Sequence, residues 1–306
     1  MKLRHLADRR TLCWALGFCP LVPSLAYVWP ALAPYLLPLA LGLAYSVGAI
    51  AHNHNHLPTF TSRRWNEAFG AWLSFFYGAP LVFWIPTHNL NHHRHTNGPG
   101  DATSTSRFAS TDTWVAALAY PMRSSKAQLP AIAEFVRSAK ERSPRLYRRV
   151  RLECAALVLG HAFALGLAVF LHGAGLGALT YGLVIALPAL FAPWAMMFTN
   201  YVQHVGCDPT SSDHHSRNFT DPTLNWLLFN AGYHTVHHEH PTAHWSRYAA
   251  LHEQRRAAVG RELEHGTVLG YCWQTYVPRR GKVRAAGAPS AVGEKPRDGC
   301  APFGHN

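Results

Sequence analysis

Long apolar stretches alternate with polar, histidine-rich stretches along this chain. From Thr11 to Ile50 there is no Lys, Arg, Asp or Glu. A helix needs about 20 apolar residues to cross a bilayer, so this tract is long enough for two membrane spans. We predict these spans at about residues 12–29 and 31–51, with a tight turn near Pro30.

A second apolar tract follows a polar central region. It predicts two more spans, at about residues 152–172 and 176–200, separated by a short uncharged turn. Residues 69–86 are also apolar, but Gly and Pro interrupt them, which favours an interfacial or re-entrant segment. We therefore expect residues 1–278 to form a single membrane domain. Residues 279–306, rich in Gly, Ala, Pro and Arg, are expected to form a disordered basic tail.

The first apolar tract could instead be a secretory signal peptide, because "PSLA" weakly resembles a cleavage site. The apolar run continues well beyond that motif, so we prefer membrane spans. Composition points the same way, since only 14 per cent of the residues are charged, against about a quarter in soluble domains.

The positions of the basic residues predict the orientation. All 28 Lys and Arg lie in the N-terminal segment, in residues 57–151, or after Ser216. Basic residues collect on the cytoplasmic side of a membrane. Four spans in two hairpins then place both termini, the central loop and all the histidine clusters on that side. The sequence therefore predicts an all-α integral membrane protein with a cytoplasmic helical cap.

The net charge of +12 fits an anionic membrane surface better than nucleic acid, because the basic residues flank the apolar tracts. Within residues 137–151, "RSAKERSPRLYRRVR" could bind CoA phosphates, and we prefer anionic lipid head groups. The six cysteines show no CxxC pair, which argues against a disulfide framework or an iron–sulfur site. The Ala-, Gly- and Arg-rich composition, with no targeting extension, favours a bacterial inner membrane.

The chain contains 21 histidines, and most of them gather in a few clusters. The first cluster, "HNHNH", continues an apolar helix. In a helix, residues i and i+4 lie about 40° apart on one face, whereas i and i+2 point in nearly opposite directions. We therefore predict His52 and His56 as a pair of metal ligands and expect His54 to point away from the metal.

The second cluster is "HNLNHHRHTN". His88 and His92 repeat the i, i+4 spacing, and His93 is adjacent. His95, at i+7 from His88, returns to the same face, so helical geometry does not exclude it as a ligand.

Two more groups complete the pattern. In "NYVQH", Asn200 and His204 stand at i, i+4 at the end of the fourth predicted span. In "YHTVHHEHPTAHW", His234, His237 and His238 fall within about 100° of arc on one helix face.

Metal chemistry explains this pattern better than isolated histidines do. Nine well-placed histidines exceed the three or four ligands of one zinc site, and the zinc-protease motif HExxH is absent. A bis-histidine haem would use histidines within the spans rather than at their ends. Imidazole-rich ligation suits iron or another transition metal, and nine ligands divide naturally between two ions. Bound histidines must be neutral, so nearby carboxylates are expected to fix their tautomers; the candidates are Asp101, Asp208, Asp213, Asp221 and Glu239.

At these residues the sequence resembles the membrane fatty-acid desaturase and hydroxylase superfamily. The superfamily's HxxxH, HxxxHH and HxxHH boxes are similar to His52-x3-His56, His88-x3-His92-His93 and His234-x2-His237-His238. Asn200-x3-His204 is similar to the NxxxH element of acyl-CoA desaturases. The resemblance covers about residues 40–250. It implies two iron ions, with Asn200 reaching one of them through a water molecule. The nine histidines that it implies as iron ligands are His52, His56, His88, His92, His93, His204, His234, His237 and His238.

The resemblance also implies an activity. It implies O2-dependent desaturation of a fatty acyl chain, carried as an acyl lipid or an acyl thioester, in a substrate tunnel that enters the cap. Two electrons come from outside the chain. No fused "HPGG" segment is present, so the donor is expected to be a separate ferredoxin, rubredoxin or cytochrome b5-like protein with its reductase.

Two alternatives stay open. "NYVQHVG" is similar to the "HYG" element of alkane monooxygenases, and "SSDHHS" resembles their "LQRHSDHH" box. A diiron hydroxylase or monooxygenase of alkyl or lipid substrates, of the alkane or carotenoid type, is therefore the second interpretation, with His214 and His215 as reserve ligands. A zinc hydrolase or metal carrier is the third. The roles of His240 and His244 are unassigned.

Overall fold

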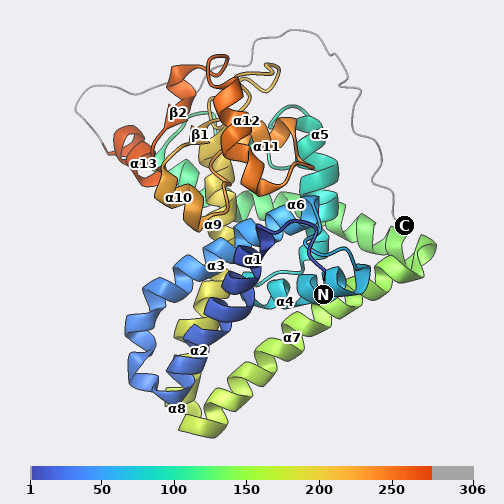
Figure 1. The fold of residues 1–306 in the computed structure, drawn as a ribbon, viewed down its shortest axis with the longest axis vertical. Coiled ribbons are helices and arrows are strands. Elements are labelled where there is room, and N and C mark those ends of the chain that lie inside the picture. The colour runs from blue at the N-terminus through green and yellow to red at the C-terminus, as the bar shows by residue number, and fades with distance from the viewer. Residues whose placement is uncertain (1, 278–306) are drawn as a thin grey trace.

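The computed structural model describes residues 2–277, and helices form most of this part of the chain (Figure 1). The predicted tail, residues 279–306, lies outside the described residues. Four helical segments are long and apolar enough to span a membrane, which confirms the prediction of four apolar helices. They are Asp8–Val28, Pro30–His56, Pro144–His172 and Ala174–His204.

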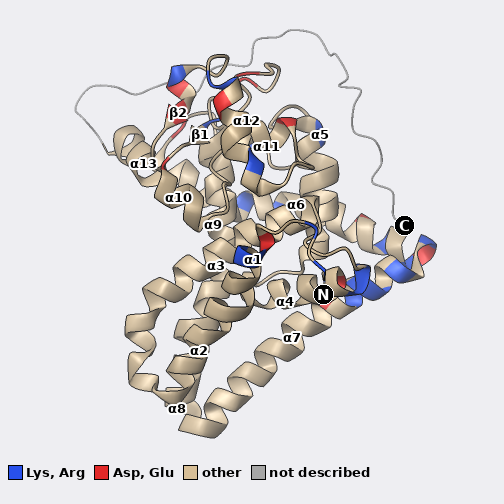
Figure 2. Ribbon diagram, in the orientation of Figure 1, with Lys and Arg blue, Asp and Glu red and all other residues tan. Residues whose placement is uncertain are grey.

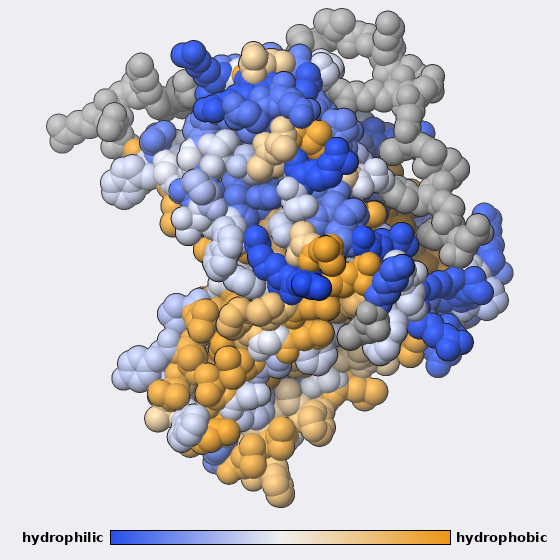
Figure 3. All heavy atoms as spheres, in the orientation of Figure 1, coloured by the Kyte–Doolittle hydropathy of each residue, from blue (hydrophilic) through white to orange (hydrophobic). Residues whose placement is uncertain are grey.

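Three of these segments contain more than one element. The first comprises α1 (Asp8–Leu12), the π-helix η1 (Cys13–Phe18) and α2 (Cys19–Val28), and the second comprises η2 (Pro30–Leu32) and α3 (Ala33–His56). The third is α7 (Pro144–His172), and the fourth comprises α8 (Ala174–Tyr181), the π-helix η6 (Gly182–Ala186) and α9 (Leu187–His204). The lower parts of these four segments contain almost no charged residues in Figure 2, and the surface there is largely hydrophobic in Figure 3.

Local sequence sets where α7 begins and ends. The Ser143 hydroxyl accepts a hydrogen bond from Leu146 N at 3.3 Å, and Pro144 occupies the first helical position, where its missing N–H has no cost. Gly173, with φ of +78°, ends the helix and lets α8 begin at once. Positive φ strains other residues, so glycine suits this turn.

Helices α3 and α9 pack side by side and carry histidines at their last turns. They approach closely at Gly48, where an added Cβ would come within 2.7 Å of Met196 Cγ. This close packing holds His52 and His56 of α3 near His204 of α9.

The apolar segment predicted at residues 69–86 is a broken helix. α4 (Arg63–Tyr77) ends at Gly78, and the chain continues as η3 (Leu81–Phe83), the π-helix η4 (Ile85–His92) and α5 (His93–His95), at an angle of 97° to α4. Gly78 has φ of +79°, and a Cβ there would clash with the Ala189 carbonyl oxygen. The bend turns the second histidine cluster toward α3 and α9.

A buried carboxylate stabilises this bend. Glu153 of α7 is fully buried, and its Oε2 accepts a hydrogen bond from Val82 N at 2.6 Å. The Ser74 hydroxyl accepts another from Leu81 N at 3.0 Å. Arg149 Nε donates to Glu153 Oε1 at 2.8 Å. The N–H groups of Leu81 and Val82, which begin η3 and have no partner within that helix, are thus satisfied by side chains.

The remaining elements gather above the apolar helices in Figure 1. The long helix α6 (Trp114–Arg142) lies against α9. A parallel pair of two-residue strands, β1 (Asn218–Phe219) and β2 (Glu264–His265), ties the C-terminal part together. The other elements are η5 (Thr105–Arg107), α10 (Pro222–Leu227), α11 (His234–Glu239), η7 (Trp245–Arg247), α12 (Tyr248–Arg255), η8 (Arg261–Leu263) and α13 (Val268–Tyr276).

Candidate metal centre

Eight of the nine predicted histidine ligands form two compact groups. The first group contains His52, His56, His88 and His237, and the second group contains His92, His204, His234 and His238. Within each group one ring nitrogen of every residue lies within 4.8 Å of those of the others. The residues come from α3, the η4–α5 segment, α9 and α11, so four separate parts of the chain converge at one place.

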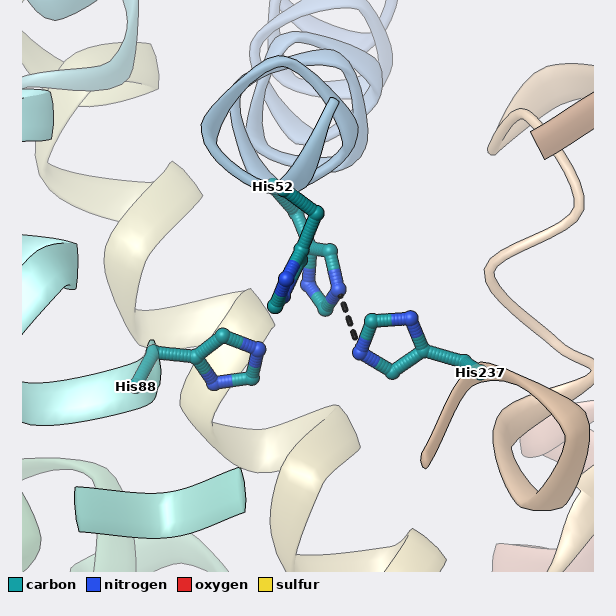
Figure 4. Close-up of side chains that lie close together, drawn as sticks. His52, His88 and His237 are labelled. Carbon is teal, nitrogen blue, oxygen red and sulfur yellow. Dashed lines mark hydrogen bonds between the residues drawn. The ribbon is translucent and has the colours of Figure 1, made fainter. Parts of the chain in front are cut away.

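In the first group, His52, His88 and His237 point toward one another from α3, η4 and α11 (Figure 4). His52 Nε2 lies 2.8 Å from His237 Nε2. Both ring nitrogens of His56 are buried and have no hydrogen-bond partner in the described part of the chain. The Trp84 ring packs against His52 and His88, with ring centroids 5.4 and 5.3 Å away.

In the second group, His204 Nε2 lies 2.9 Å from His234 Nε2 and 3.2 Å from His238 Nε2. His92 Nε2 is buried and, within residues 2–277, has no hydrogen-bond partner.

His93, the ninth predicted ligand, lies between the groups. Its Nε2 is 2.9 Å from His237 Nε2, and its ring centroid is 4.6 Å from that of His238.

Because η4 is a π-helix, the histidines of the second cluster point in different directions from those that an α-helix would give them. The i, i+4 spacing suggested that His88 and His92 act together, but they belong to different groups. In a π-helix the bonding runs from i to i+5, which makes His93 a close neighbour of His88, with their Nε2 atoms 3.1 Å apart. His92 is thereby directed to the second group.

The donor set fits a metal ion. Nitrogens about 3 Å apart match the edges of a coordination shell with metal–nitrogen distances of about 2.0–2.1 Å. Burial lowers the pKa of His234, His237 and His238 well below the usual value, which keeps these rings neutral. Neutral imidazoles that direct lone pairs at a common point repel one another unless a cation lies between them. Imidazole donors suit zinc, copper, iron and nickel, so each group could hold one such ion.

One predicted carboxylate orients a histidine of this centre. Asp101 Oδ2 lies 2.7 Å from His92 Nδ1, and both side chains are buried. Burial alone raises the pKa of the Asp101 carboxyl, but His92 and the hydrogen bonds from Thr103 outweigh it and hold that pKa well below its usual range. The carboxylate accepts a hydrogen bond from Nδ1–H of His92, so Nε2 is left as the lone-pair donor toward the second group.

The other predicted carboxylates lie elsewhere. Asp213 and Glu239 form ion pairs with Arg255. Asp221 caps α10 by accepting from Leu224 N at 2.7 Å, and Asp208 accepts from Thr210 N at 2.9 Å.

Two hydrogen-bond partners of the histidines also support the centre, and no sequence signal could have identified them. The Tyr248 hydroxyl lies 3.2 Å from His237 Nδ1, and His204 Nδ1 donates to the carbonyl oxygen of His215 at 3.1 Å. Both contacts leave the Nε2 atoms of His237 and His204 facing the groups. The partners come from other elements, so only the fold could reveal them.

His54 turns away from both groups, as its i+2 position predicts. Its Nδ1 lies 2.9 Å from the Thr59 hydroxyl, and its ring packs on Phe69 with centroids 5.2 Å apart. The side chain is buried and supports the loop after α3.

The remaining histidines lie outside the two groups. His95 packs beside Gly100, and His214 and His240 are exposed. His244 Nε2 lies 3.2 Å from Asp8 Oδ2, which joins the N-terminal segment to the region after α11. His215 is buried with its ring centroid 5.4 Å from that of His238, beside the second group but not in it.

Asn200 lies on α9, one turn before His204. Its Nδ2 donates to the Tyr120 hydroxyl at 2.8 Å. It also lines a cavity of about 260 Å³ that reaches histidines of both groups, His52 and His88 on one side and His92 and His234 on the other. Most of the other lining is apolar, from Tyr77, Phe83, Trp84, Leu129, Ile132, Pro193, Met196 and Met197.

A family model described as fatty acid desaturase matches residues 27–267 of the chain. The chain therefore belongs to this family, within the superfamily of membrane desaturases and hydroxylases. The matched range contains both histidine groups, Asn200 and the cavity. A search of curated proteins finds no match. Family membership indicates an oxidoreductase of the desaturase or hydroxylase type.

Proposed function

We propose that this protein is a membrane diiron enzyme that desaturates a fatty acyl chain with O2. The cavity is the observation that carries this proposal, because it joins histidines of both groups to an apolar space. An apolar cavity with a few convergent polar groups is the usual form of a small-molecule site. A saturated chain offers no polar handle, so apolar walls suit it.

The two histidine groups and His93 would hold two iron ions. Asn200 would reach the iron of the second group through a water molecule. When bound, the irons supply the oxidation, with O2 as oxidant and two electrons from a separate ferredoxin, rubredoxin or cytochrome b5-like donor and its reductase. The chain's own residues position the substrate. Trp84 and Met196 would pack against the acyl chain. The methylene that they place nearest the histidines would be the one that is oxidised.

Residues 1–278 would form one membrane domain whose four spans make two hairpins. Both termini and the histidine-bearing cap would face the cytoplasm of a bacterial inner membrane. The positions of the basic residues support this orientation. The buried polar groups at the break between α4 and η3 are satisfied within the protein, as a segment at membrane depth requires.

The test is expression in a bacterial host followed by mass spectrometry of the lipids. Loss of two hydrogens from acyl chains supports desaturation, whereas gain of one oxygen identifies a hydroxylase. The purified protein should contain about two irons per chain, because nine imidazoles exceed one coordination shell. His238→Ala, which alters the second group, should abolish the product and lower the iron content. One zinc and no iron would refute the proposal.

A further inference from the structure

The mouth of the cavity lies on one face of α6. Of the described residues that line the cavity, only Ser125 and Leu129 are exposed, and both belong to this helix. They are four residues apart, so they lie on the same side of α6. The cavity therefore opens past these two side chains.

That face of α6 is an exposed apolar stripe. Leu118, Met122 and Leu129 are 40, 62 and 59 per cent exposed. At 100° per residue these side chains and Ser125 fall within about 60° of arc. Exposed apolar side chains in line on a helix mark a surface that contacts lipid or a partner.

The two other faces of α6 differ from this stripe. Tyr120 and Ser124 are fully buried and face the protein. Arg123, Lys126 and Glu134 are exposed on the remaining side, within about 80° of arc. A helix with one apolar and one charged exposed face is typical of the boundary between lipid and water.

The apolar stripe is continuous with the exposed surface of α9, one of the four candidate spans. Trp114, at the start of α6, lies 6.3 Å between ring centroids from Phe198, which stacks on Trp194 at 5.3 Å. Farther along this span, Leu190 is 71 per cent exposed. Tryptophan is enriched where a span meets the membrane surface. The same lipid layer that covers α9 would thus cover the mouth.

Resting on the proposed function, we propose that the substrate is an acyl chain of a membrane phospholipid, which enters sideways from the bilayer between α6 and α9. A chain already in the bilayer reaches Leu129 without leaving an apolar environment. A water-soluble acyl thioester would approach from the charged face of α6, where no described lining residue is exposed.

A binding test does not depend on activity. A photo-crosslinking amino acid is placed at Leu129 in the full chain, and for comparison at Glu134, with the protein in vesicles of phosphatidylethanolamine and phosphatidylglycerol. We expect crosslinks from position 129 to intact phospholipid acyl chains, several-fold more than from position 134. Equal yields at the two positions would overturn the proposed lipid-facing mouth.

A second test separates the two carriers of the acyl chain. In a bacterial host, phospholipids are labelled with ¹³C acyl chains, fatty-acid synthesis is then blocked to drain the acyl thioesters, and the protein is induced. Modification of the labelled phospholipid chains is expected to continue. Labelled phospholipid chains that stay unmodified after induction, while an acyl thioester added to membranes from the same cells is modified, would overturn the inference and leave the proposed function intact.

Variants complete this test. Leu129→Asp puts a charge at the mouth and is expected to lower the modification at least tenfold with unchanged iron content, whereas Glu134→Gln should leave it unchanged. An equal effect of the two variants would contradict the proposal that the cavity opens beside Leu129. If no lipid is modified although two irons are bound, the proposed function fails, and the crosslinking result still decides whether lipid enters beside Leu129.

Discussion

Replacing Asp101 by Asn is expected to weaken metal binding at the second histidine group. The carboxylate accepts four hydrogen bonds: Thr103 N and Thr103 Oγ1 donate to Oδ1, each at 2.7 Å, and Asn97 N at 2.8 Å and His92 Nδ1 at 2.7 Å donate to Oδ2. An asparagine amide has only one oxygen. In either orientation its NH₂ group faces a backbone N–H, of Thr103 or of Asn97.

The magnitude follows from these contacts. One buried N–H without a partner costs about 1–3 kcal/mol of folding stability. If the NH₂ group replaces Oδ2, His92 must accept at Nδ1 and carry its proton on Nε2, the atom that faces the second group. Loss of such a supporting carboxylate weakens metal binding about 10- to 100-fold, which corresponds to about 1.4–2.7 kcal/mol.

The assay is equilibrium dialysis of the purified protein against graded Fe²⁺ or Co²⁺, with the metal measured by mass spectrometry. At limiting metal we expect Asp101→Asn to retain the ion of the first group and to lose that of the second. Asp208→Asn is a matched control, because Asp208 accepts the same pair of bonds from Thr210 but contacts no histidine of either group. Wild-type affinity in Asp101→Asn, or an equal loss in Asp208→Asn, would refute the reasoning.

Three further predictions concern other parts of the molecule. His93→Ala should lower the occupancy of both metals because the ring lies between the groups, whereas His54→Ala should keep both; metal loss only in His54→Ala would contradict the assignment. Glu153→Ala should lower the free energy of unfolding by about 3–5 kcal/mol, because it leaves the Arg149 charge without its buried partner; Glu153→Gln should cost less, and chemical denaturation in detergent that finds the two equal would count against a role of the charge. Burial raises the pKa of the Cys207 thiol to about 11, so Cys207 in the folded protein should resist alkylation at pH 7.5, and its rate should rise about tenfold for each unit by which the pH is raised toward 11; peptide mass spectrometry that finds Cys207 rapidly labelled at neutral pH would contradict this.

Much of the fold could be predicted because it depends on local sequence. A run without charge long enough to cross a bilayer identifies a span wherever it packs, and four such runs match four helices of the structure. The direction of His54 likewise follows from helix geometry. Asp101 could be named as a candidate because it lies only nine residues after His92.

Other features depend on how distant segments pack. The winding of η4 as a π-helix separates His88 from His92 and brings His93 beside His88. Helical spacing on an α-helix predicts a different neighbour. The 97° break after α4 requires Glu153, which follows Gly78 by many residues and lies on another helix.

The sequence by itself identified the histidines that the structure brings together, because imidazoles at helical spacing beside apolar runs have few other uses. The tertiary structure decided how these histidines divide between the two groups, since four chain segments must converge before His52 can lie 2.8 Å from His237. It also decided where the cavity opens. The exposure of Leu129 depends on the packing of α6 against α9, which no local pattern of apolar residues specifies.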